Sequence, residues 1–167
     1  MGYLCLSCFE EYDGDLLKLE YSDGYRHRCP NKKCGDINLV EIDDLILPVI
    51  KLLNIKGYYT EYTCSAHSYE NNTNTYIAFD EECVPDVIPK GFFIEDDKYY
   101  EENYHCSRTG NNMCIRKWYD EELNEYELHK EICKTMINLM KWVEKLPYRD
   151  EYEENIEQCD LRQEHEI

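Results

Sequence analysis

Two cysteine pairs near the start of the chain have the spacing of a metal site. Two residues separate Cys5 from Cys8, four separate Cys29 from Cys34, and twenty lie between the pairs. Zinc prefers four soft ligands in a tetrahedron, and a close cysteine pair supplies two of them. We therefore expect these four thiolates to bind a structural Zn²⁺ with no open coordination position. The alternative is a set of small buried thiols that cluster along the chain by coincidence.

The second pair lies in the run RHRCPNKKCG, whose composition suits a tight metal-binding turn. Pro30 follows the first cysteine of this pair and Gly35 follows the second, and both residue types favour turns. Lys32 and Lys33 between the two cysteines would temper the negative charge of the thiolates. His27 is an alternative ligand.

The run TEYTCSAHS contains a second set of reactive side chains, Cys64, Ser65 and His67. His67 can activate the Cys64 thiol as a nucleophile if both side chains fold to one side, and Ser65 with nearby amides can hold a phosphate or nucleotide. No residue that would orient the histidine is evident. The residues near in sequence are Asn71, Asp80 and Glu81. We favour the alternative, a strand end with a buried cysteine, a capping serine and a surface histidine.

A second metal site is conceivable from Cys106, Cys114, His129 and Cys133. His129 and Cys133 are one helical turn apart, so both can point at one ion. Cys133 also lies on an apolar stripe, however, and a core position is the interpretation that we favour for it.

Residues 41–55, EIDDLILPVIKLLNI, have the apolar pattern of a helix. Asp43 or Asp44 is expected to cap its start, and Pro48 is tolerated in a first turn. Gly57 is expected to end it.

Strand patterns follow in YYTEYTC and TYIAFD. A further strand with a polar flank is expected within GFFIEDDKYYEENYHCSRT, and NNMCIRKWY is ambiguous but favours a strand. A long helix is expected over residues 121–146, capped by Asp120 and ended by Pro147. This order predicts an α+β fold, in which a zinc-ribbon-like module precedes a small antiparallel sheet packed against two helices. The expected divisions are a ribbon module at 1–40, an α+β domain at 41–148 and an acidic tail at 149–167.

The composition is strongly acidic, with 36 acidic and 18 basic residues among 167 and a net charge of −18. Such a surface repels free nucleic acid and attracts basic partners, although plain solubility explains it equally well. The start of the chain lacks the pattern of a signal peptide, so we expect a cytoplasmic protein whose ten cysteines are mostly reduced. No apolar run approaches 18 residues, which argues against a membrane span.

The run EIDDLILPVIKLLNIKGYYTEYTCSAH…TYIAF, preceded by CPNKKCG, resembles a group of small proteins common in bacteriophages and their Gram-positive hosts. In that group a cysteine-rich ribbon and a helix precede a Cys-Ser-Gly-His-like turn. The match covers residues 1 to about 80. Ala66 replaces the usual glycine, which puts the left-handed backbone that glycine favours in question. The resemblance implies a phage-type setting and no particular reaction.

Three functions follow as expectations. The first is a zinc-stabilised accessory or counter-defence protein that binds a basic, nucleic-acid-handling host protein, in part by imitating nucleic acid. No direct nucleic-acid contact is expected for it. The second is a small enzyme or ligand-binding protein that acts on a nucleotide or nucleic acid through Cys64 and His67. The third is a zinc-ribbon adaptor whose RHRCPNKKC run touches phosphates, which the net charge disfavours.

Overall fold

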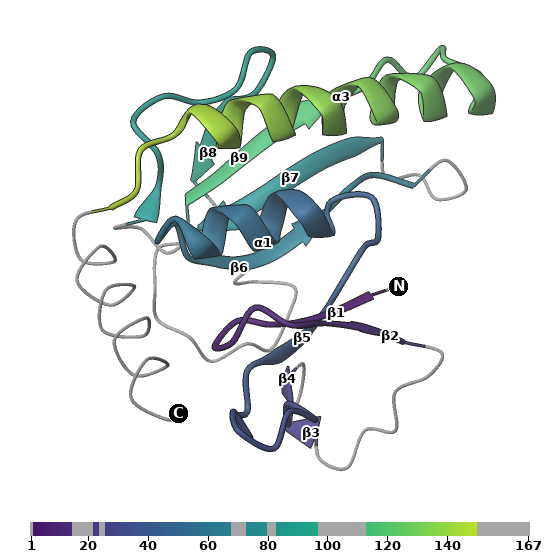
Figure 1. The fold of residues 1–167 in the computed structure, drawn as a ribbon. Helices are drawn as coiled ribbons and strands as arrows, with labels where there is room; N and C mark the ends of the chain where they lie inside the picture. Colours follow the sequence, from purple (N-terminus) through teal and green to yellow (C-terminus); the bar gives the residue numbers. More distant parts are fainter. Residues whose placement is uncertain are drawn as a thin grey trace.

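In the part of the chain that the structure describes, two antiparallel sheets and two helices build an α+β fold, as predicted (Figure 1). The computed structural model describes residues 2–14, 22–23, 26–67, 73–79, 83–96 and 113–149. The first sheet contains β1 (Gly2–Cys5), β2 (Glu11–Asp13), β3 (Ser22–Asp23), β4 (Arg26–His27) and β5 (Leu39–Ile42). The second contains β6 (Thr60–Cys64), β7 (Asn74–Phe79), β8 (Phe93–Asp96) and β9 (Met113–Trp118). The helices are α1 (Leu47–Ile55) and α3 (Glu125–Lys145).

Both helices cover the same face of the second sheet, whose strand order is β6-β7-β9-β8 (Figure 1). Ile77 of β7 lies opposite Ile115 of β9, and both side chains are fully buried. The spacing of apolar residues along α3 places one stripe of the helix toward these isoleucines. The members of this stripe that share their apolar cluster include Leu128, Ile132 and Leu139.

The first helix begins later than its sequence pattern suggests. Ile46 is the N-cap residue of α1, with no side-chain cap, so the prediction that Asp43 or Asp44 caps it is wrong. The backbone carbonyl of Asp43 accepts the N–H groups of Ile46 and Leu47, and its carboxylate is used elsewhere. Gly57 follows the helix with φ 83°, which confirms the predicted stop.

The second helix is capped by Asn124 instead of Asp120. The Asn124 side chain accepts the N–H of Glu127, and the Glu127 carboxylate accepts the N–H of Asn124, which is a capping box. Asp120 instead accepts the N–H of Glu122 in the preceding turn. The predicted start at residue 121 is therefore four residues too early, while Pro147 lies just beyond the helix as expected.

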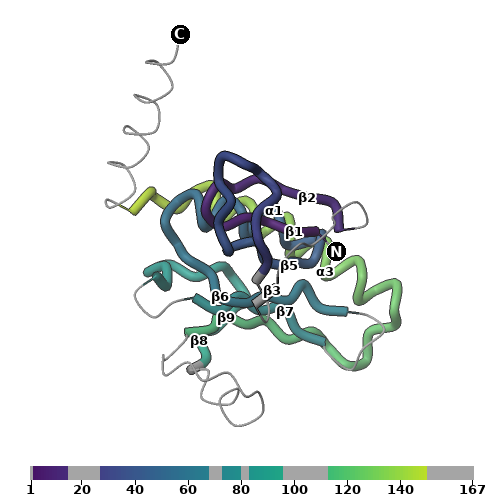
Figure 2. The backbone as a smooth tube through the Cα atoms, turned by 90° about the horizontal axis from the view of Figure 1, so that it is seen from below, coloured from purple at the N-terminus to yellow at the C-terminus, as the bar shows by residue number. Residues whose placement is uncertain are grey.

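The first sheet has the order β2-β1-β5-β4-β3 and contributes to two separate cores. Leu4 and Ile42 pack in the main core with the helices. Tyr3 and Leu39 pack on the other side with the N-terminal cysteines. The boundary expected at residue 40 falls inside β5. Figure 1 shows the strands of the first sheet below α1 and β6, and Figure 2 views the molecule from that side.

The acidic tail expected at 149–167 lies, from residue 150 onward, outside the described residues. Within the described part of the chain, neither helix is both long and apolar enough to cross a bilayer.

Lys56 joins the ends of the two helices. Its side chain is buried, and Nζ donates to the carbonyls of Glu144 at 3.0 Å and Leu146 at 2.6 Å. The last carbonyls of a helix have no partner within the helix and carry partial negative charge. The ammonium group also lies 5.2 Å from the ring centroid of Tyr148. Lys56 therefore supplies a C-terminal cap for α3 from another helix.

Replacing this ammonium should destabilise the fold. We expect Lys56→Met to lower the free energy of unfolding by about 2–3 kcal/mol, because buried hydrogen bonds to a charged donor are lost. Lys51→Met on the same helix is the matched control. Lys51 makes an exposed ion pair with Glu11, and its loss should cost less than about 1 kcal/mol. Chemical denaturation measures both, and equal effects would contradict the capping role.

Candidate functional site

The four N-terminal cysteines lie together. Their sulfur atoms are all within 4.8 Å of one another, and the Cys5–Cys34 and Cys8–Cys29 sulfur pairs are each 3.7 Å apart. A disulfide would require about 2.05 Å, so these are four free thiols. The predicted ligand set is therefore brought to one point, in an arrangement that suits a metal ion.

Two similar turns present the sulfurs. The N–H of Cys5 donates to the carbonyl of Glu10 at 3.0 Å, and the N–H of Cys29 donates to that of Asp36 at 2.8 Å. The second loop is two residues longer, which matches its wider cysteine spacing. The residue after the second cysteine of each pair is left-handed, with φ 58° at Phe9 and 61° at Gly35. The predicted role of Gly35 in this turn fits that conformation.

The surroundings of the sulfurs differ. Burial raises the pKa of the Cys5 thiol, and backbone N–H groups of the following turn offset part of this effect. Burial also acts on Cys29, but side-chain hydrogen bonds with Tyr12, Cys5 and Cys8 and a backbone hydrogen bond at Asn31 together outweigh it and lower its pKa. The Tyr12 hydroxyl lies 3.4 Å from the Cys29 sulfur. His27, the alternative ligand, is not part of the four-thiol group. Its ring packs edge-on against the Tyr3 ring, with 5.8 Å between the ring centroids.

The CSAH motif ends β6 and meets a carboxylate from another element. Asp43 Oδ2 accepts the backbone N–H of Ser65 at 3.0 Å and its hydroxyl at 3.1 Å. The same oxygen lies 3.6 Å from His67 Nε2. Asp43 thus supplies the third residue beside the histidine that was not evident from the sequence. In the sequence, Asp43 is marked only as an acidic residue before a predicted helix, which predicts a role as a cap of that helix.

Ala66 has a left-handed backbone, although it stands where the related motif has glycine. Its φ is 74°, and its N–H donates to the Cys64 sulfur at 3.4 Å. A non-glycine residue in this region costs roughly 1–2 kcal/mol. The turn therefore keeps its shape without glycine, because contacts on both sides hold it.

A buried hydrogen-bond chain holds the other side of the motif. The Thr75 hydroxyl donates to the Ser65 carbonyl at 3.0 Å and lies 2.8 Å from the Tyr119 hydroxyl. Burial raises the pKa of Tyr119, so it stays neutral at ordinary pH. Cys64 is buried, as the alternative interpretation expected. Ser65 is buried as well, and the His67 side chain is 22% exposed.

The second predicted metal set does not gather among the described residues. Cys114 is fully buried on β9, where Arg116 Nη2 lies 3.9 Å from its sulfur. His129 Nε2 and the Cys133 sulfur are 3.7 Å apart on α3, with no third donor in the described part of the chain. Cys106 lies outside the described residues, as do Asn71, Asp80 and Glu81.

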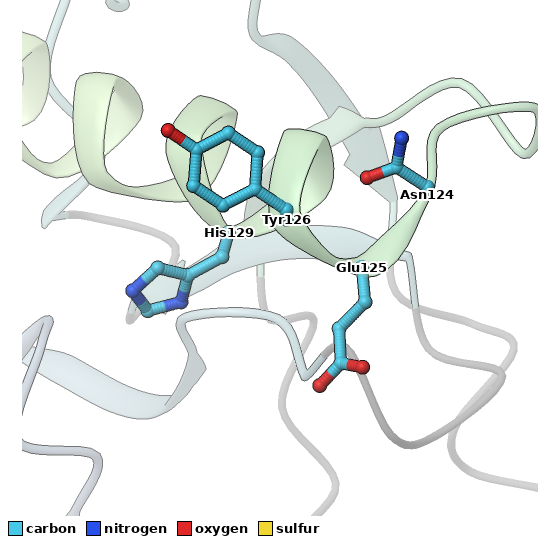
Figure 3. A pocket seen from close by; sticks show the side chains of 4 residues that line it. All are labelled: Asn124, Glu125, Tyr126 and His129. Carbon is cyan, nitrogen blue, oxygen red and sulfur yellow. The ribbon is translucent and has the colours of Figure 1, made fainter.

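Figure 3 shows His129 beside a hollow at the start of α3, which is lined also by Asn124, Glu125 and Tyr126. All four residues come from this one helix end. The hollow therefore does not join His129 to the cysteines of the predicted set.

No protein-family model matches the chain, and neither the curated proteins nor the solved structures contain a significant match.

Removing the Asp43 carboxylate should loosen the motif. In Asp43→Ala the buried donors of Ser65 lose their acceptor, and we expect the free energy of unfolding to fall by about 2–4 kcal/mol. Asp43→Asn keeps an acceptor oxygen and should cost clearly less. Denaturant unfolding compares the two, and an equal loss in both would show that charge matters more than these hydrogen bonds.

Proposed function

We propose that the chain is a zinc-stabilised, acidic protein of phage type that binds a basic, nucleic-acid-handling host protein. The observation that carries the zinc part is the 3.7 Å separation in both sulfur pairs. Zinc–sulfur bonds of about 2.3 Å in a tetrahedron place sulfurs about 3.8 Å apart. Both of these sulfur pairs therefore match the spacing expected around zinc, which supports the proposal.

Such a zinc ion is structural. Four thiolates complete its coordination and leave no position for a substrate. The ion would join the turn after β1 to the loop between β4 and β5, where the small apolar cluster around Tyr3 and Leu39 offers little burial. This is the role of the metal in a zinc-ribbon module, with the ion replacing a larger core.

Loss of one ligand should therefore unfold the N-terminal module. We expect Cys34→Ser to lose the zinc of this site and to expose its amides to hydrogen exchange, while α3 stays protected. Cys83→Ser is the control, because Cys83 is a buried thiol outside the cluster. Elemental analysis and hydrogen-exchange mass spectrometry measure both. Full retention of zinc in Cys34→Ser would contradict this assignment.

The negative charge, which supports the proposal of a basic partner, is unevenly distributed along the chain. The described residues carry 14 basic and 19 acidic side chains, a net charge of −5. The remaining residues carry 4 and 17, a net of −13. Residues 150–167 alone hold eight acidic side chains and one basic. Long-range attraction of a cationic partner would therefore come mainly from these segments.

Binding to such a partner should depend on salt. In affinity capture from nuclease-treated host lysate, we expect retention to fall at least about tenfold between about 0.05 and 0.5 M salt, because screening shortens to a few ångström. A full-length variant with the eight acids of 150–167 changed to their amides should show a shallower dependence. Salt-independent capture would remove the charge argument.

A second candidate function is favoured by the Asp43 contact. A small enzyme or ligand-binding protein that acts on a nucleotide through Cys64 and His67 needs a group that orients the histidine, and the Asp43 carboxylate lies near it, with Oδ2 3.6 Å from His67 Nε2. If affinity capture from host lysate retains no host protein, this second function is favoured over the first.

A further inference from the structure

We propose that Asp43, Cys64 and His67 form a second metal site, which binds one Zn²⁺-like divalent ion and leaves one coordination position open. One ligand atom from each residue lies within 4.8 Å of the others. The inference does not depend on the binding function proposed above.

The spacing suits a metal better than a direct hydrogen bond. His67 Nε2 and Asp43 Oδ2 are 3.6 Å apart, beyond ordinary hydrogen-bond distance. Zinc bonds to nitrogen and oxygen of about 2.0–2.2 Å place such atoms about 3.3–3.5 Å apart in a tetrahedron. A small inward movement of either side chain therefore brings this pair to the metal-bound distance.

Neighbouring groups already orient two of the three ligands, Asp43 and Cys64. Ser65 donates two hydrogen bonds to Asp43 Oδ2, and the Ala66 N–H donates to the Cys64 sulfur. Metal sites commonly hold their ligands through such outer hydrogen bonds. The left-handed backbone at Ala66 directly follows this N–H, so the strained conformation lies within the turn that carries the proposed ligands.

The donor set selects the class of metal. A thiolate, an imidazole and a carboxylate together suit a borderline ion such as Zn²⁺, and they disfavour Mg²⁺ or Ca²⁺. Cys64 is buried, while the side chains of Asp43 and His67 are 11% and 22% exposed. Three protein ligands leave a fourth position for water or an anionic ligand atom, as in catalytic zinc sites. Cys64 would then act as a ligand and not as a free nucleophile.

Metal stoichiometry tests the site in the full chain. After equilibration with Zn²⁺ and removal of the excess, the unmodified chain should retain two ions per molecule, and Cys64→Ser and His67→Ala should retain one. Cys133→Ser is the matched control, because its sulfur also lies near a histidine but without a third donor in the described residues. It should retain two.

A stoichiometry of one in the unmodified chain, lost in Cys34→Ser, would overturn the second site and leave the first intact. Two ions in both Cys64→Ser and His67→Ala would overturn it as well. If Cys64→Ser fails to fold, the more exposed His67→Ala decides. Substitution with Co²⁺ gives a second readout, since the thiolate-to-cobalt absorption should lose the contribution of one sulfur in Cys64→Ser.

Discussion

The close approach of four cysteine sulfurs is the constraint on which the N-terminal part of the fold depends. The sulfurs lie within 4.8 Å of one another in a small apolar cluster. Burial without a counter-charge disfavours thiolates, and a cation between them reverses that preference. The strands of the first sheet are two to four residues long, so strand pairing alone gives β1 and β4 little support and the cysteine turns must add to it.

Two charged side chains flank α1 and connect it to the rest of the molecule. Asp43 precedes the helix and accepts hydrogen bonds from Ser65 at the end of β6. Lys56 follows it and donates to the last carbonyls of α3. Each charge satisfies polar groups that would otherwise be buried without partners. A helix of nine residues thereby organises both the CSAH motif and the end of the long helix.

The acidity of the chain and the geometry of its sites belong to different parts of the sequence. The described fold is only mildly acidic, and most of the net charge lies outside it. The proposed metal sites are confined to the described fold. The proposed attraction of a partner and the proposed metal binding can therefore be tested separately by substitution.

Local patterns determined much of this protein. Cysteine spacing indicated the four-thiol group, because two short turns need only local backbone to present a pair of sulfurs. Apolar periodicity located both helices, and alternation located β6 and β7, because burial of one face requires it. The exact helix starts and the partner of His67 were decided only by the tertiary structure. Asp43 lies more than twenty residues before the motif, and whether its carboxylate caps a helix or binds Ser65 depends on how α1 packs beside β6, which no local pattern encodes.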